Sequence, residues 1–164
     1  DVVAEIQNSY GLFFDDVVTA GKGRGERRVI GAFSPRTVER LSDFDQFPEN
    51  AAITIGDKDV LHLLRDAKKT RKQAVSESFV RNLPTELANA KAVLFDTEDP
   101  ALIYVFDAQG NRKSKLVVRI DYYQRVRGTD GKRRDIRVNA ARTAGVVQPE
   151  NLRDQKYKLL DGEL

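Results

Sequence analysis

The sequence has no cysteine, methionine or tryptophan, and it has a single histidine among 164 residues. Without cysteine there is no disulfide and no thiolate metal site, and one histidine excludes a metal centre built from several imidazoles. No apolar run approaches the roughly 20 residues that a membrane helix requires, and no signal-peptide pattern opens the chain. Only an all-carboxylate Mg²⁺ or Ca²⁺ site stays open. We therefore expect an intracellular protein with no membrane contact and no cofactor.

The charges are numerous but unevenly distributed. Charged residues make up 32% of the chain and hydrophobic residues 40%, which is typical of one globular core with a strongly hydrated surface. The formal net charge is only +3, yet residues 119–142 hold eight Lys or Arg against three Asp, a local net of +5. Any argument for nucleic-acid binding therefore depends on where these cations lie.

The N-terminal part differs in pattern from the rest. Residues 1–20 place apolar side chains at helical spacing, and the following segment, 21–28 (GKGRGERR), has the composition of a flexible basic linker. We therefore predict that residues 1–27 are the tail of an upstream helical region plus a basic Gly-rich linker. Residues 28–164 would then form a single domain.

Short strands and capped helices alternate in the first half of that domain. Ser34 and Pro35 supply an N-cap and a first-turn proline for one helix, and Asp57 can cap the next. The predicted order is strand 28–33, helix 35–41, strand 51–55, helix 57–73 and two short helical segments at 76–82 and 83–87.

From residue 91 the pattern changes to strands joined by short turns. The predicted strands are 91–97, 101–108, 114–126 and 133–141, with turns at 109–111 and 128–131. Such a succession is typical of an antiparallel meander. The sequence therefore predicts an α+β fold in which N-terminal helices pack on one face of a four-stranded antiparallel sheet.

Alternation within the last two strands divides their residues between two faces. Leu116, Val118, Ile120 and Tyr122 alternate with polar neighbours in one strand, as Ile136 and Val138 do in the next. We expect the apolar face to take the helices. The other face would present Arg119, Asp121, Tyr123, Arg137 and Asn139, and a purely solvated face is the competing interpretation.

The helix predicted for residues 57–73 carries the only histidine. His62, Arg65, Lys69 and Lys72 fall on the side opposite its apolar face. An imidazole among cations, with arginines and tyrosines on a sheet, is suited to metal-independent RNA cleavage, in which a base takes the 2′-hydroxyl proton and cations stabilise the phosphate. A solvated helix face is the competing interpretation.

Several motifs resemble a known family. They are VIGAF and SPRTVERL, AITIGDKDVLHLLRDAK, LPTELANAKAVLFD, ALIYVFD and KLVVRIDY, covering about residues 28 to 160. Their order resembles the small-nuclease fold that joins barnase, EndoU, colicin-type and RelE-type toxins. Within that fold they resemble the phage branch found at the C-terminus of phage Mu F-like head-morphogenesis (minor capsid) proteins.

The resemblance implies an endoribonuclease-type toxin or effector domain of a phage head protein, located in the virion or the bacterial cytoplasm. By position, it implies His62 as the acid/base group, Arg65 and Lys69 as phosphate-binding companions and Thr143 as a polar site residue. The implied partners are RNA, an acidic immunity protein, and phage portal or capsid proteins. Because the chain has one histidine, the second proton-transfer group would have to be a tyrosine, a lysine or a carboxylate.

Two other functions stay open at this stage. The domain can be a non-catalytic head-morphogenesis module that binds nucleic acid or capsid and portal protein, or an effector with different chemistry such as NAD-dependent ADP-ribosyl transfer. Lys72, Arg119, Tyr123, Arg137 and Asn139 are the expected RNA- or phosphate-binding residues, and no residue set is expected to hold a metal.

Overall fold

The structure is a computed structural model that describes residues 1–69, 73–108, 110 and 112–164. Lys72 and two residues of the predicted 109–111 turn therefore lie outside the described residues. The elements are α1 (Val2–Ala20), β1 (Arg27–Ala32), α2 (Pro35–Leu41), η1 (Ser42–Phe44), β2 (Ala52–Gly56), α3 (Asp57–Lys69), α4 (Glu77–Arg81), α5 (Leu83–Ala88), β3 (Ala92–Asp96), β4 (Ala101–Asp107), β5 (Lys113–Arg127), β6 (Arg133–Val147), η2 (Pro149–Arg153) and β7 (Tyr157–Gly162).

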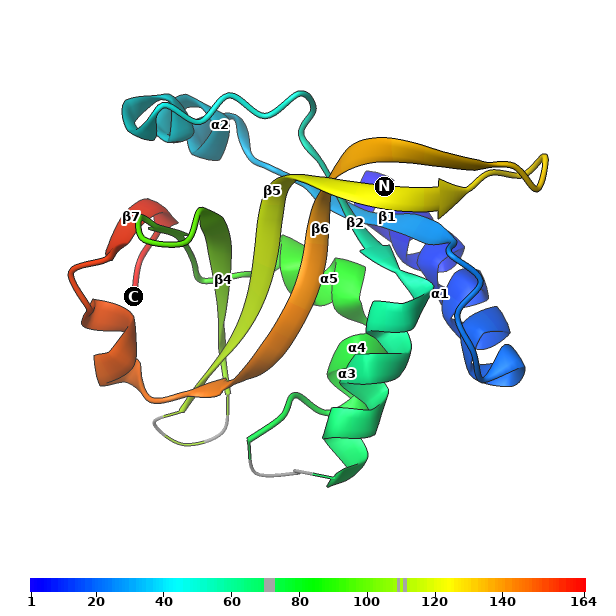
Figure 1. Cartoon of the computed structure of the whole chain (residues 1–164). Helices are drawn as coiled ribbons and strands as arrows, with labels where there is room; N and C mark the ends of the chain where they lie inside the picture. Colours follow the sequence, from blue (N-terminus) through cyan, green and yellow to red (C-terminus); the bar gives the residue numbers. More distant parts are fainter. Residues whose placement is uncertain (70–72, 109, 111) are drawn as a thin grey trace.

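The strands form one seven-stranded sheet with the order β1-β2-β6-β5-β4-β3-β7 (Figure 1). All neighbouring strands are antiparallel except β2 and β6, which run parallel. The α+β class is confirmed, but the prediction of a four-stranded antiparallel sheet is wrong. The sequence marks β1 and β2 as strands without showing that they join the later meander, because a strand's local pattern does not identify its partner.

One face of the sheet carries the main hydrophobic core. It receives the buried side of α1, with Tyr10, Phe13 and Phe14 at most 3% exposed, together with side chains from α3, α4 and α5. Burying each such aromatic side chain contributes about 2 kcal/mol. The Tyr10 hydroxyl donates to the Val80 carbonyl at 2.7 Å, which fixes α1 to α4. The predicted division between 1–27 and 28–164 falls inside β1, after its first residue, and α1 shares the core of the sheet.

The opposite face of β3 and β4 is also covered. There Leu94, Ile103 and Val105 form a second, smaller cluster with Leu152 of η2. Both faces of these two strands are therefore buried, which explains why their sequences read as continuous apolar runs rather than as alternations. Within the described part of the chain, no helix is long and apolar enough to cross a membrane.

The β5–β6 pairing contains two irregularities close together. Between Val117 and Val118 the register shifts so that Arg142 of β6 has no direct partner. Between Arg119 and Tyr122 it shifts again, and here β5 holds the extra residue. Asp121 lies in this second bulge with φ 49°, a left-handed conformation that aspartate tolerates better than most residues.

Candidate nucleic-acid interface

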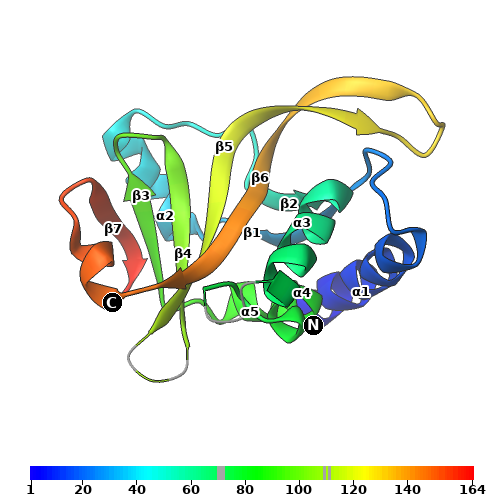
Figure 2. The same cartoon turned by 60° about the horizontal axis from the view of Figure 1, so that its bottom comes forward.

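The outer halves of β5 and β6 form a two-stranded ribbon that leaves the sheet. β4 pairs with β5 only as far as Arg119, and β2 pairs with β6 only at residues 139–141. Residues 122–138, which we call the ribbon, therefore form strand pairs only with each other, although the Arg127 N–H also donates to the Gly25 carbonyl at 2.9 Å. Figures 1 and 2 both show its tip extending beyond the other strands. A two-stranded ribbon is one of the elements that can enter a nucleic-acid groove.

The ribbon is strongly cationic. It carries six exposed cations against two carboxylates: Arg125, Arg127, Lys132, Arg133, Arg134 and Arg137 against Asp130 and Asp135. Asp130 pairs with Arg134 at 2.8 Å and Asp135 with Arg125 at 3.6 Å. Among the described residues, the other four cations form no ion pair with a carboxylate, and Arg137 has only longer-range charge interactions with Glu49 and Asp121.

Two of those unpaired arginines face each other. Arg127 on β5 is the direct register partner of Arg133 on β6, next to the turn. Like charges directly opposite each other on two strands destabilise the pairing. The arrangement lowers the stability of the isolated hairpin and suits the binding of an anion at its tip.

Tyr123 and Arg137, both predicted from alternation, lie together on the ribbon. They are register partners, the Arg137 guanidinium carbon lies 4.7 Å from the Tyr123 ring centroid, and an Arg137 N–H donates to the phenol oxygen at 3.4 Å. This hydrogen bond raises the pKa of Arg137. The Tyr123 side chain is 63% exposed, so most of its surface stays available to a ligand.

A hollow of about 490 Å³ lies where the ribbon leaves the sheet, and we call it the root hollow. Three of the predicted residues, Arg119, Tyr123 and Thr143, line it together. Two lining residues were missed as site residues by sequence reasoning, Tyr122 and Arg142. The sequence carries no signal for either, because the bulges that bring them here are tertiary features. The full lining is Pro100, Arg119, Ile120, Asp121, Tyr122, Tyr123, Arg142 and Thr143.

Both arginines of the root hollow are held by carboxylates. Arg119 donates to Asp99 in the turn between β3 and β4, and this hydrogen bond lowers the pKa of Asp99. The Arg142 Nε lies 3.8 Å from a carboxylate oxygen of Asp59, and its guanidinium carbon lies 5.0 Å from the Tyr122 ring centroid. A phosphate entering the hollow would therefore compete with Asp99 and Asp59 for the two guanidinium groups.

Asp59 connects the first turn of α3 to this region. Its burial raises its pKa, while the charges of Arg142 and Arg27 oppose that rise. Burial also disfavours the charged form of Arg27 and so lowers its pKa. The Arg27 Nε donates to the Thr54 hydroxyl at 3.1 Å. The Arg27 Nη2 is buried without a hydrogen-bond acceptor among the described residues. The network fixes the start of α3 beside the root of the ribbon.

The structure does not gather the predicted catalytic residues of α3 into one cluster. His62 is 53% exposed and its Nε2 lies 3.4 Å from a carboxylate oxygen of Asp66; when protonated, its charge lowers the pKa of Asp59 one turn earlier. Arg65 instead lines a separate hollow beside α1, and Lys69 is exposed at the end of the helix. Within the described residues no hydrogen bond or ion pair joins His62 to Arg65, Lys69 or Thr143.

Asn139 is buried and holds together backbone segments of the fold. It is 1% exposed, and its amide donates to the carbonyls of Asn50 at 2.8 Å and Ala52 at 2.9 Å. Its side-chain oxygen accepts from the Asp121 N–H at 3.2 Å. Alternation placed Asn139 on the polar face, but the segment before β2 covers it, so its side chain stabilises the second bulge.

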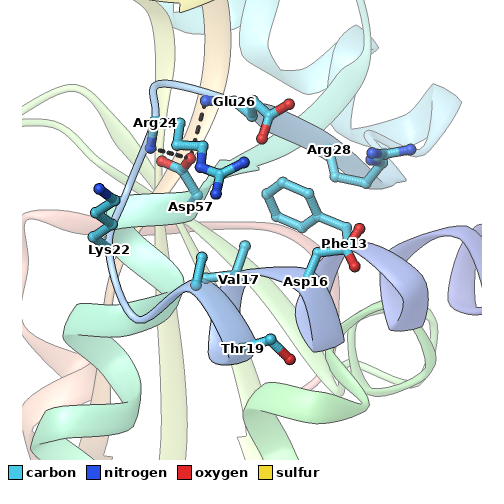
Figure 3. A pocket seen from close by; sticks show the side chains of 10 residues that line it. Phe13, Asp16, Val17, Thr19, Lys22, Arg24, Glu26, Arg28 and Asp57 are labelled. Atoms are coloured by element: carbon cyan, nitrogen blue, oxygen red, sulfur yellow. Dashed lines mark hydrogen bonds between the residues drawn. The ribbon is translucent and has the colours of Figure 1, made fainter.

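A further hollow of about 440 Å³ lies between α1 and the segment that leads to β1 (Figure 3). Its central carboxylate, Asp57, accepts the backbone N–H groups of Arg24 at 2.7 Å and Glu26 at 3.1 Å. Three cations and three carboxylates line this hollow, so it has no net preference for an anion. Asp57 therefore serves to fix the predicted linker onto α3. The charged lining residues are Lys22, Arg24, Arg28, Asp16, Glu26 and Asp57.

No group of three His, Asp or Glu side chains that could hold a metal ion occurs in the described ranges. No family model matches the chain, and neither a curated protein nor a solved structure proved significantly similar to it.

Proposed function

We propose that the protein binds single-stranded RNA along the ribbon, with the root hollow receiving part of the bound strand. The observation that carries the proposal is the set of exposed ribbon cations, four of which have no carboxylate partner in the described residues, with Arg127 directly opposite Arg133. Lys and Arg at such positions supply non-specific affinity for phosphates. The exposed ring of Tyr123 suits stacking of an unpaired base, which favours a single strand over a duplex.

The salt dependence of binding provides the test. If the four unpaired cations each neutralise one phosphate, log K should fall with log salt at a slope of about −3 for a single strand. We would measure fluorescence anisotropy of a labelled RNA of about 12 nucleotides between about 50 and 200 mM salt, beside single-stranded DNA and duplex RNA of equal length.

A double variant, Arg127→Gln with Arg133→Gln, should reduce that slope by about 1.4 and weaken binding about tenfold. The matched control is Arg153→Gln with Lys158→Gln, which removes the same charge from exposed positions on η2 and β7. Equal slopes for the two variants would refute binding by the ribbon. Tighter binding of duplex RNA than of the single strand would refute the assignment of an unpaired strand.

Metal-independent cleavage of the bound RNA is a second candidate function. It is favoured by two interactions of Asp59, one with the charge of protonated His62 and one with Arg142, whose Nε lies 3.8 Å from its carboxylate, because Arg142 lines the root hollow. In this proposal His62 transfers a proton, and Arg119 and Arg142 stabilise charge on the phosphate.

Incubation of the protein with labelled RNA in EDTA tests this second function. The expected products carry 2′,3′-cyclic phosphate ends, and His62→Ala should abolish their formation while RNA affinity changes by less than about twofold. Asn151→Ala, at an exposed position on η2, serves as the control. Cleavage that persists in His62→Ala, or that never occurs with the unaltered protein, would exclude the mechanism and leave binding as the function.

A further inference from the structure

A second cationic surface, which shares no lining residue with the ribbon or the root hollow, lies where the end of α1 meets α3. It encloses a hollow of about 490 Å³, which we call the helical hollow. α1 and the following turn contribute one side, and α3 contributes the other through residues at helical spacing. The lining residues are Val18, Gly21, Lys22, Gly23, Lys58, Leu61, Leu64, Arg65 and Lys68.

The helical hollow combines positive charge with an aliphatic surface. Four of its lining residues are cations and none is a carboxylate. Val18 is 47% exposed, and Leu61 and Leu64 are half-buried against the main core. Like charges one turn apart, such as Arg65 and Lys68, repel each other on a helix. A ligand with an apolar centre would cover the exposed aliphatic surface, and anionic groups around that centre would neutralise the cations that repel each other.

Such chemistry differs from that of the ribbon. Among the described residues, no aromatic side chain lines the helical hollow, so a nucleic-acid base would find nothing to stack on there, and a phosphodiester would leave the aliphatic surface uncovered. A protein segment with leucine-like side chains flanked by Asp or Glu matches both properties, in the manner of an amphipathic helix bound in a groove.

We propose that the helical hollow is a docking site for an acidic protein segment that inserts one or two aliphatic side chains between α1 and α3. In this assignment Arg65 belongs to the docking site and Lys58 and Lys68 flank the inserted side chains. The proposal does not depend on RNA binding, since it uses none of the ribbon or root-hollow residues.

Labelled peptides of about 16 residues, built only from Leu and Glu, provide the probe. One peptide spaces its leucines every three to four residues, a second has the same composition in an order that breaks this spacing, and a third replaces every Leu by Gln. We expect the first to bind the full chain with a Kd on the order of 10–100 μM, and the other two at least about tenfold more weakly.

A charge-reversal variant locates the site. Lys58→Glu with Lys68→Glu should weaken binding of the first peptide at least about tenfold. The control, Arg153→Glu with Lys158→Glu, applies the same change of net charge at exposed positions elsewhere and should leave peptide affinity within about twofold. Thermal unfolding and RNA anisotropy of both variants show that each is folded and has kept its ribbon.

Three results would overturn the proposal. Equal affinity for all three peptides would show attraction by charge alone, and equal weakening in the two variants would place the peptide elsewhere. If RNA displaced the peptide from the helical hollow, and if the substitutions of Lys58 and Lys68 also weakened RNA binding, that surface would be part of the RNA site. Failure of RNA binding to the ribbon leaves these measurements unaffected.

Discussion

Substitution of Asn139 by alanine separates a structural role for this residue from a role in RNA contact. The side chain is 1% exposed and makes three hydrogen bonds to backbone groups, two as donor and one as acceptor. Those bonds join the segment before β2 to β6 and to the Asp121 bulge of β5. Alanine would leave Asp121 N–H and the carbonyls of Asn50 and Ala52 without their partner.

The expected loss follows from the burial of these groups. A buried polar group left without a partner costs about 1–3 kcal/mol, and Asn50 lies at an exposed position where water can replace the amide. We therefore expect Asn139→Ala to lower the free energy of unfolding by about 3 kcal/mol. Urea unfolding followed by circular dichroism measures this change. Asn89→Ala, which loses one exposed hydrogen bond to Thr85, should cost less than about 1 kcal/mol.

The opposite pattern would refute this reasoning. If Asn139→Ala lost less than about 1 kcal/mol of stability while its RNA affinity fell at least about tenfold, the side chain would be acting on the ligand, as strand alternation predicts.

Two further substitutions test contacts at the root hollow and in the core. Asp99→Asn should tighten RNA binding about two- to fivefold in the anisotropy assay, because Arg119 is then free for a phosphate; unchanged or weaker binding would contradict this. Arg119 lowers the pKa of Asp99, so their pair stabilises the fold at pH values above the ordinary carboxyl pKa. This stabilisation is lost as the pH falls through the lowered pKa of Asp99. The free energy of unfolding of Asp99→Asn should therefore change less with acidification than that of the unaltered protein. Tyr10→Phe should lower the free energy of unfolding by about 1–2 kcal/mol, because the buried Val80 carbonyl loses its donor; no change in urea unfolding would show that this bond does not anchor α1.

Local chemistry in the sequence was enough to locate most helices and strands. Ser34 caps α2 by accepting from the Thr37 N–H at 3.1 Å, and Pro35 occupies its first turn, as the sequence predicts. Helical spacing likewise identifies α1, predicted for residues 1–20 and found at Val2–Ala20. These features depend on neighbours within a few residues, so they can be recognised without knowing the tertiary structure.

The pairing of strands could not be predicted in the same way. β2 lies between β1 and β6, so its position is decided by packing with residues far along the chain. For residues 150–160 the sequence allows either a short helix or an extended segment, and in the structure Tyr157–Gly162 pairs with β3 as an edge strand. The energy that selects these partners comes from tertiary burial, which a strand's own residues do not reveal.

Alternation predicted the facing of most side chains on β5. Leu116 and Val118 are fully buried and Arg119 lies on the other face, as expected, and Tyr123 is exposed beyond the second bulge. At the bulge itself, however, Tyr122 lines the root hollow together with Tyr123, although alternation places these two neighbours on opposite faces. A single sequence does not mark where such a bulge occurs.

The two bulges of β5 and β6 also have a consequence for how this hairpin tolerates insertions and deletions. The offset that begins between Val117 and Val118 is undone between Arg119 and Tyr122, because each strand contributes one extra residue. The hairpin is therefore in the same register at its tip as at its base, and only two residue pairs lie between the bulges. Removing Arg142 or Asp121 alone would leave a single bulge, so the register at the tip would differ by one residue from that at the base, whereas removing both would restore a regular ladder and erase the bend at the root hollow. Sequence changes that alter the direction of the ribbon are thus expected to occur in compensating pairs, one on each strand.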